Sequence, residues 1–117
     1  MKKILLTIAM VAAMTACGPK IPDQVIDTTE AGKDIIGYKG PVPVQITIKD
    51  GKVESVKALD NQETPKFFDR ASVILNSWDG MKVKDAASKK VDAISGATYT
   101  SNAIIENVRL GLSMVQK

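Results

Sequence analysis

A run of small and hydroxylated residues around one glycine leads directly into an amphipathic helical pattern near the end of the chain. Residues 92–102 read Asp-Ala-Ile-Ser-Gly-Ala-Thr-Tyr-Thr-Ser-Asn. After them, Ile104, Val108, Leu112 and Val115 recur at the spacing of one apolar face of an α-helix. Such a helix has to bury this face against another layer. The sequence therefore predicts a core helix that starts from a glycine turn, with the end of an apolar strand before it at 91–94.

The start of this helix is a predicted anion site. Unpaired backbone N–H groups and the positive end of the helix dipole favour an anion there, and Gly96 lets the backbone turn tightly. Hydroxyl groups next to the turn can donate to phosphate oxygens, and any one of them could carry an ester. A plainer interpretation remains open, because many helices begin with Ser or Thr as simple N-caps. The hydroxyls concerned are those of Ser95, Thr98, Thr100 and Ser101.

The spacing Asp92-x-x-Ser95-Gly96-Ala97-Thr98, followed by Thr100-Ser101, resembles the flavinylation motif of the FMN-binding domain family. This family includes periplasmic components of two electron-transport complexes, the G subunit of Rnf and the C subunit of Nqr. In these relatives a flavin transferase that draws on FAD joins FMN to the last Thr of Ser-Gly-Ala-Thr through a phosphoester. The resemblance implies that Thr98 is a covalent FMN attachment residue, and that the other motif residues bind the cofactor. These are Asp92, Ser95, Gly96, Ala97, Thr100 and Ser101.

Two further stretches carry the resemblance upstream. Glu63-Thr64-Pro65 resembles a Glu-Thr-Pro stretch that lies beside the flavin in the relatives, which implies Glu63 and Thr64 as further cofactor-binding residues. There a Gly usually follows, so Lys66 is a departure. Gly37-Tyr38 resembles the start of the family's domain. The resemblance thus covers residues 37–117 as a single FMN-binding domain.

The beginning of the chain is typical of a bacterial lipoprotein. Lys2-Lys3 precede an apolar run at 4–14 that is too short to span a bilayer and suits a signal peptide. Thr15-Ala16-Cys17 resembles a lipobox, with Met14 where Leu is more usual. We expect residues 1–16 to be a lipoprotein signal peptide and Cys17 to be lipidated, which would hold the protein to the lipid bilayer outside the cytoplasm. The alternative is an ordinary cleaved signal with a stray cysteine.

Removal of 1–16 would leave one small domain of nearly balanced charge. Both lysines of the signal would leave with it, so 14 basic residues would face 13 acidic ones. A net charge near +1 without a Lys/Arg run predicts no binding to nucleic acid. Residues 17–36 are predicted to be the lipidated N-terminus followed by a tether or wrapping segment. Within it, residues 24–36 are equally compatible with a first strand.

The middle of the chain predicts the scaffold. Residues 42–48 alternate apolar and polar as a half-buried strand does, Asp50-Gly51 is a hairpin turn signal, and 53–59 is the return strand. The apolar residues change face along the return strand, so we expect either a bulge near Glu54-Ser55 or a strand that is buried on both sides. Thr64-Pro65 opens a helix that ends at Asp79-Gly80, and 81–90 is a short helical or loop link. The prediction is an α+β fold, a small antiparallel sheet with a β-hairpin and two main helices. Phe67, Phe68 and Trp78 are expected in its core.

The residue types restrict the chemistry. The chain has no His and a single Cys, which excludes Ser–His and Cys–His nucleophilic pairs and leaves no metal site and no catalytic residue to predict. Redox activity would have to come from a bound cofactor, FMN by the resemblance. The sequence therefore predicts an electron carrier whose partners are a flavin transferase and membrane electron-transport proteins. Two alternatives stay open: a flavin-dependent reductase component acting on an external acceptor, and a non-redox envelope lipoprotein.

Overall fold

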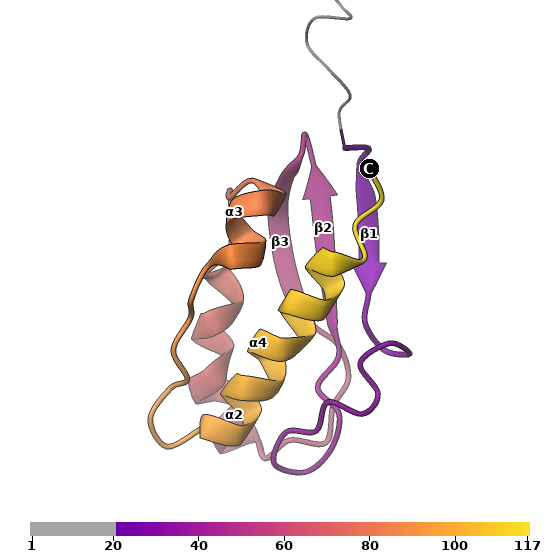
Figure 1. The fold of residues 1–117 in the computed structure, drawn as a ribbon. Helices are drawn as coiled ribbons and strands as arrows, with labels where there is room; N and C mark the ends of the chain where they lie inside the picture. The colour runs from indigo at the N-terminus through magenta and orange to yellow at the C-terminus, as the bar shows by residue number, and fades with distance from the viewer. Residues whose placement is uncertain (1–20) are drawn as a thin grey trace, which may run out of the picture.

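A computed structural model of the chain describes residues 21–117, so the predicted signal peptide and Cys17 lie outside the described residues. A three-stranded antiparallel sheet lies behind one long helix, and three shorter helical segments lie to one side of that helix (Figure 1). This arrangement confirms the predicted α+β fold. In chain order, the elements are β1 (Gln24–Asp27), β2 (Val44–Lys49), β3 (Lys52–Ala58), α2 (Pro65–Ala71), the 3₁₀ helix η1 (Ser72–Asn76), α3 (Val83–Ser88) and α4 (Thr98–Ser113).

The hairpin of β2 and β3 follows the apolar alternation of the sequence. Val44, Ile46 and Ile48 point to the helical layer and are fully buried, whereas the residues between them are partly exposed. Asp50 and Gly51 both have positive φ, 54° and 73°, which is the geometry of a type I′ turn. The predicted hairpin is confirmed.

The predicted bulge lies on β3. Thr47 pairs with Ser55 while the next residue of β2, Ile48, pairs with Val53, so Glu54 has no partner across the hairpin. The extra residue brings both Val53 and Val56 to the buried face of the sheet, although three positions separate them.

The folded unit begins upstream of residue 37, because β1 is an edge strand of the same sheet. It pairs antiparallel with β2, with Ile26 opposite Ile46, and Ile26 is its one buried residue. Of the two interpretations left open for 24–36, a strand therefore applies to Gln24–Asp27, followed by a loop. The sheet thus includes part of the segment 17–36 that was predicted as the lipidated N-terminus with a tether or wrapping segment.

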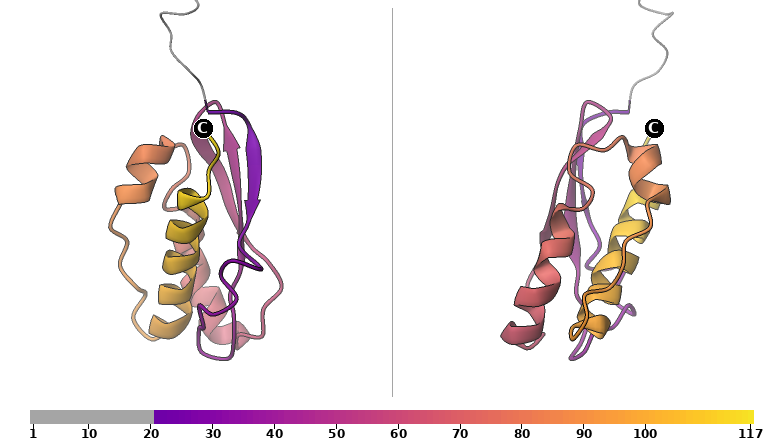
Figure 2. Two further views of the ribbon diagram at one scale, coloured as in Figure 1. Left: turned by 45° about the vertical axis from the view of Figure 1, so that its right-hand side comes forward. Right: turned by 90° about the vertical axis from the view of Figure 1, so that its left-hand side faces the viewer.

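The helix α4 covers one face of the sheet, as the side views in Figure 2 show. Its buried side carries the predicted apolar residues Ile104, Val108 and Leu112, and also a polar one, Asn107, which is fully buried. Asn107 Nδ2 donates to Val42 O and to Ala103 O, each at 2.9 Å, and Asn107 Oδ1 accepts from Thr28 Oγ1 at 2.9 Å. This network joins α4 to the loop after β1 and to the chain entering β2.

Two local predictions differ from the structure. Residues 91–94 form no strand; they run as an irregular segment whose Val91 and Ile94 pack against the core. The helix predicted from Thr64 to Asp79 is α-helical only over Pro65–Ala71 and continues as η1, which keeps Ile74 and Trp78 buried. Trp78 is a core residue as predicted, whereas Phe67 and Phe68 are only partly buried.

Gly111 is where α4 comes closest to the sheet, and Gly111→Ala is expected to destabilise the protein. A Cβ there would lie 2.6 Å from Ile46 Cδ1 and 3.1 Å from Thr28 Cγ2. Overpacking of this kind costs about 1–3 kcal/mol, more than the roughly 1 kcal/mol that Ala gains over Gly in a helix. We expect a net loss near 1 kcal/mol in urea unfolding. Gly40→Ala, where a Cβ would meet nothing within 4 Å, is the control, and a higher midpoint for Gly111→Ala would contradict this packing.

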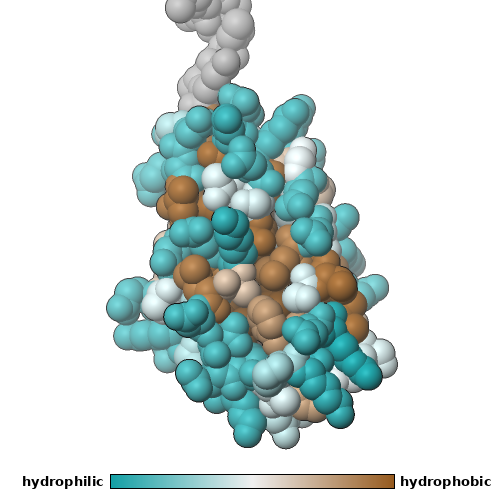
Figure 3. Space-filling view, turned by 180° about the vertical axis from the view of Figure 1, so that it is seen from behind, coloured by the Kyte–Doolittle hydropathy of each residue, from teal (hydrophilic) through white to brown (hydrophobic). Residues whose placement is uncertain are grey.

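The face turned away from α4 is mixed in character. Hydrophilic side chains dominate it, with hydrophobic patches across its middle (Figure 3). Val25 and Val73 are among the large apolar residues of the domain that remain more than half exposed. Within residues 21–117, no helix has the length and apolar character that crossing a bilayer requires.

Candidate functional site

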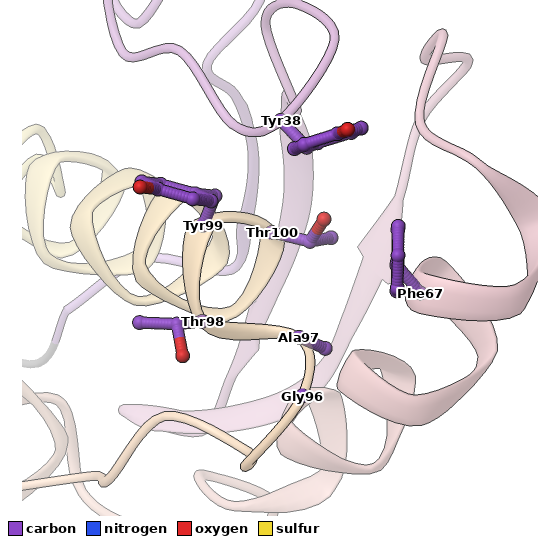
Figure 4. A pocket seen from close by; sticks show the side chains of 7 residues that line it. All are labelled: Tyr38, Phe67, Gly96, Ala97, Thr98, Tyr99 and Thr100. Carbon is purple, nitrogen blue, oxygen red and sulfur yellow. The ribbon is translucent and has the colours of Figure 1, made fainter.

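A mainly apolar pocket of about 220 Å³ lies at the N-terminal end of α4 (Figure 4). Three segments distant in sequence supply its walls: the loop that carries Tyr38, the helix α2 with Phe67, and the glycine turn with the first turn of α4. The lining residues are Tyr38, Phe67, Gly96, Ala97, Thr98, Tyr99 and Thr100. The central part of the sequence motif, residues 96–100, therefore lines a cavity.

Three aromatic rings surround this pocket. Tyr38 packs edge-on against Phe67, with ring centroids 5.4 Å apart and planes at 73°, and its centroid lies 6.3 Å from that of Tyr99. Tyr38 and Tyr99 are both more than half exposed. The chain has only five aromatic residues in all, so three of them gathered at one exposed pocket form a surface suited to a flat aromatic ligand.

The turn before α4 is built as predicted, but the helix starts earlier. Gly96 has a φ of 85°, a conformation that favours glycine, and Thr98 is already the first residue of α4. Among the described residues, no acceptor takes the backbone N–H groups of Thr98, Tyr99 or Thr100. These three groups are available to an anion, as expected for a helix N-terminus.

The structure separates the four hydroxyls of the motif into two kinds. Thr98 and Ser95 are exposed. Thr100 and Ser101 are buried and used internally: Thr100 Oγ1 donates to Glu63 Oε1 at 2.6 Å, and Ser101 Oγ accepts from Ile94 N at 3.0 Å. Only Thr98 is both exposed and part of the pocket lining.

Glu63 lies next to the pocket but does not line it. Its carboxylate is buried, with 7 % of the residue exposed, and accepts from Tyr38 N at 2.7 Å and Lys39 N at 2.6 Å besides Thr100. Burial alone would raise the pKa of Glu63. The hydrogen bonds from Thr100 and from the backbone of Tyr38, Lys39 and Gly40 outweigh it, so the pKa lies below its ordinary value.

In Glu63→Gln, the free energy of unfolding should therefore fall less steeply than in wild type as the pH is lowered into the acid range. Since the folded-state pKa is lowered, the carboxylate stabilises the fold above the ordinary Glu pKa of about 4.3, and this contribution is lost as the pH falls through the folded-state value. Urea unfolding at about pH 7 and about pH 3.5 should show the gap between wild type and Glu63→Gln shrinking at the lower pH. Glu106→Gln, on the exposed side of α4, is the matched control. Parallel curves for wild type and Glu63→Gln would contradict the expected linkage.

Three cationic side chains lie around the pocket. Arg70, at the end of α2, reaches over Gly96, because a Cβ on that glycine would lie 2.7 Å from Arg70 Nη1. Lys39 Nζ lies 5.7 Å from the centroid of the Tyr38 ring, and Lys66 Nζ lies 5.8 Å from that of Phe67. The pocket thus combines apolar walls with a positive rim, which suits a ligand that is both aromatic and anionic.

The remaining residues implied by the resemblance lie outside the pocket lining. Asp92 is exposed and upstream of the turn, and Thr64 occupies the N-cap position of α2 without a side-chain hydrogen bond. Conversely, Tyr38, Phe67 and Tyr99 line the pocket although the sequence did not single them out as site residues. The position of Tyr99 between the two Thr residues of the motif is a signal that could have indicated this residue, whereas the motif gives no signal for Tyr38 or Phe67. Within residues 21–117, no group of His, Cys, Asp and Glu could hold a metal ion.

Comparison with known proteins agrees with this geometry. Residues 37–113 match the FMN-binding domain family. One similar protein is the G subunit of the ion-translocating oxidoreductase complex of Buchnera aphidicola subsp. Baizongia pistaciae (strain Bp), 30 % identical over 95 residues, which cover 68 % of this chain and 44 % of the relative. The chain thus spans less than half the length of this relative. The family match covers the glycine turn, the aromatic walls and Glu63, and by it the chain belongs to the FMN-binding domain family.

Proposed function

We propose that this protein carries FMN, joined through a phosphoester to Thr98, and passes electrons between partners of a membrane electron-transport chain. The observation that carries the proposal is the position of Thr98. Of the four Ser and Thr hydroxyls of the motif, it offers the one that is both exposed and part of the pocket lining, at the first position of α4 in a pocket that three aromatic residues also line. Membership of the FMN-binding domain family and similarity to the G subunit of an ion-translocating oxidoreductase complex support this function.

The residues present fit such a cofactor. The free N–H groups at the start of α4 and the guanidinium of Arg70 can hold the phosphate, and Tyr38, Phe67 and Tyr99 can cover part of the flavin ring. The pocket volume of about 220 Å³ lies below the roughly 300–1,000 Å³ of sites that enclose a ligand, so much of the ring would stay exposed. An exposed ring edge suits transfer of electrons to a docked partner, and redox chemistry is what the flavin would supply.

Attachment needs a partner enzyme, because the chain contributes only the acceptor. We propose a flavin transferase that uses FAD: the hydroxyl oxygen of Thr98 forms a bond to the FMN phosphorus, the phosphoanhydride bond breaks, AMP leaves, and the hydroxyl proton is released. Asp92, exposed near the acceptor, is proposed to assist binding of the transferase or its metal. Ser95 and Gly96 would shape the approach to Thr98.

The mass of the protein tests the proposal directly. In protein purified from its own host, the peptide that carries Thr98 should be heavier than its unmodified mass by FMN less one water, and this added mass should survive denaturation. With dithionite and an artificial acceptor, the flavin should reduce and reoxidise without turnover of a pyridine nucleotide or organic acid. An unmodified mass would argue for the non-redox alternative, and steady turnover of a small substrate would argue for the reductase alternative.

Location at the outer face of a bacterial membrane is part of the proposal, and it rests on residues 1–17 of the sequence. Cys17→Ser should move the protein from the membrane fraction to the soluble fraction, because a lipidated cysteine carries several acyl chains and stable attachment needs more than one. Ser88→Ala, on the exposed side of α3, is a control that should fractionate like wild type. Unchanged fractionation of Cys17→Ser would contradict the lipoprotein assignment.

A further inference from the structure

The wall of the pocket that carries Tyr38 is a loop whose hydrogen bonds to the rest of the fold all go to one residue. Residues 37–40 close on themselves through a hydrogen bond from Gly37 N to Gly40 O at 2.8 Å, and Ile36 bridges to Pro41. Within the described residues, their hydrogen bonds to the rest of the chain go to Glu63 alone, from the N–H groups of Tyr38, Lys39 and Gly40. Besides the packing of the Tyr38 ring on Phe67, the polar attachment of this wall therefore depends on a single side chain.

The same carboxylate also binds the opposite wall. Glu63 Oε1 accepts from Tyr38 N at 2.7 Å and from Thr100 Oγ1 at 2.6 Å, so one oxygen atom receives a donor from each side of the pocket. Glu63 Oε2 accepts from Lys39 N at 2.6 Å. Both oxygens of the carboxylate thus accept hydrogen bonds, as a buried carboxylate requires if it is to stay charged.

The surrounding chain is shaped to admit this carboxylate. A Cβ on Gly37 would overlap Glu63 Oε1 and would lie 2.9 Å from Val42 Cγ2, so only a glycine lets the loop come close enough to donate. Asn61 Oδ1 accepts from Glu63 N at 3.1 Å, which fixes the backbone that presents the side chain. Loop, carboxylate and helix thus fit together as one unit.

We propose that Glu63 is a positioning residue that holds the Tyr38 wall against the first turn of α4 and so sets the shape of the flavin pocket without touching the flavin. This assigns it a different role from the cofactor contact that the sequence implied. The link to the flavin rests on the proposed function, whereas the link between loop and helix is a property of the chain itself. A second consequence concerns Thr100: because its hydroxyl is buried and donates to Glu63, it cannot compete with Thr98 as the residue to which the flavin is attached.

Native-state hydrogen exchange of the full chain without flavin tests the link. In Glu63→Gln, the amides of Tyr38 and Lys39 should lose protection by about tenfold or more relative to the amide of Ile46 in the centre of the sheet, because one acceptor oxygen becomes an NH₂ group. The test uses the ratio of protection at Tyr38 and Lys39 to protection at Ile46, because a general loss of stability would lower the protection of all three amides together. Thr100→Val keeps the carboxylate and removes one donor, so it should give a smaller loss at the same two amides.

Glu54→Gln is the matched control, because Glu54 is an exposed carboxylate on the β3 bulge. It should leave the ratio unchanged. An unchanged ratio in both Glu63→Gln and Thr100→Val would overturn the proposal, and if Glu63→Gln does not fold, Thr100→Val decides alone. Equal loss in Glu54→Gln would also overturn it.

The effect of Glu63 on the flavin pocket is measured separately, on protein that carries the flavin. The fluorescence anisotropy of the flavin should fall and its quenching by iodide should rise in Glu63→Gln, with the attachment still at Thr98 by peptide mapping. Unchanged anisotropy and quenching would overturn the pocket role while leaving the link intact. Absence of flavin from wild-type protein would refute the proposed function, and the exchange ratio would still decide whether Glu63 holds the wall.

Discussion

Thr98→Ala is expected to abolish covalent flavin entirely while leaving the fold intact. Thr98 is exposed and makes no side-chain hydrogen bond among the described residues, so its loss removes an acceptor oxygen and no structural contact. The expected result is an unmodified mass for the peptide that carries position 98 and no flavin fluorescence in the denatured protein band. Urea unfolding of Thr98→Ala should match that of protein without flavin.

The other hydroxyls of the motif supply the controls. Ser95→Ala removes an exposed hydroxyl that lies outside the pocket lining and should keep the flavin. Thr100→Ala and Ser101→Ala remove buried hydrogen bonds to Glu63 and Ile94, so they should lower the yield of folded protein and at most weaken attachment. Flavin that resists denaturation in Thr98→Ala would refute the assignment of the acceptor.

Asn107→Ala is expected to have the largest effect on stability. The amide of Asn107 makes three hydrogen bonds in a fully buried position, to Val42, Ala103 and Thr28. Truncation leaves the carbonyl of Val42 without this donor, takes an acceptor from Thr28 and opens a small cavity. Each unsatisfied buried group costs about 1–3 kcal/mol, so the free energy of unfolding should fall by roughly 2–4 kcal/mol.

The measurement is urea unfolding followed by far-UV circular dichroism, with the m-value unchanged and the midpoint lowered. Asn102→Ala is the matched control, because Asn102 is an exposed residue of the same helix and should change stability by about 0.5 kcal/mol or less. Equal effects of the two substitutions would show that the buried network contributes little.

The sequence predicted the elements whose pattern is local. The hairpin turn and the apolar face of α4 follow from residues close together in the chain, and both are confirmed. For β3 the local pattern left two alternatives, and the structure has the bulge. Residues 91–94 were predicted as a strand end because Val91, Ala93 and Ile94 are apolar. In the fold, these residues pair with none of the three strands, and Val91 and Ile94 pack against the core as part of an irregular segment.

The site was predicted in part for the same reason. The glycine turn and the exposed Thr98 follow from the motif itself. The aromatic walls do not, since Tyr38 and Phe67 come from loop and helix segments whose meeting with α4 depends on the tertiary fold. The role of Glu63 in joining these walls could not be predicted from its neighbours in sequence, because the residues that donate to its carboxylate lie 23 to 37 positions away.

The two ends of the folded unit are fastened to each other. Gln24 Nε2 donates to Gln116 O at 3.0 Å, and Gln116 N donates to Gln24 Oε1 at 2.9 Å, beside the C-terminal end of α4 (Figure 1). The pocket lies at the opposite end of this helix, whose 16 residues span about 24 Å. With Cys17 held in a bilayer as proposed, the seven residues from 17 to 23 add at most about 25 Å. The pocket would then lie no farther than about 50 Å from the lipidated cysteine, and the encounters of the flavin with membrane partners would be governed by the effective concentration within that distance.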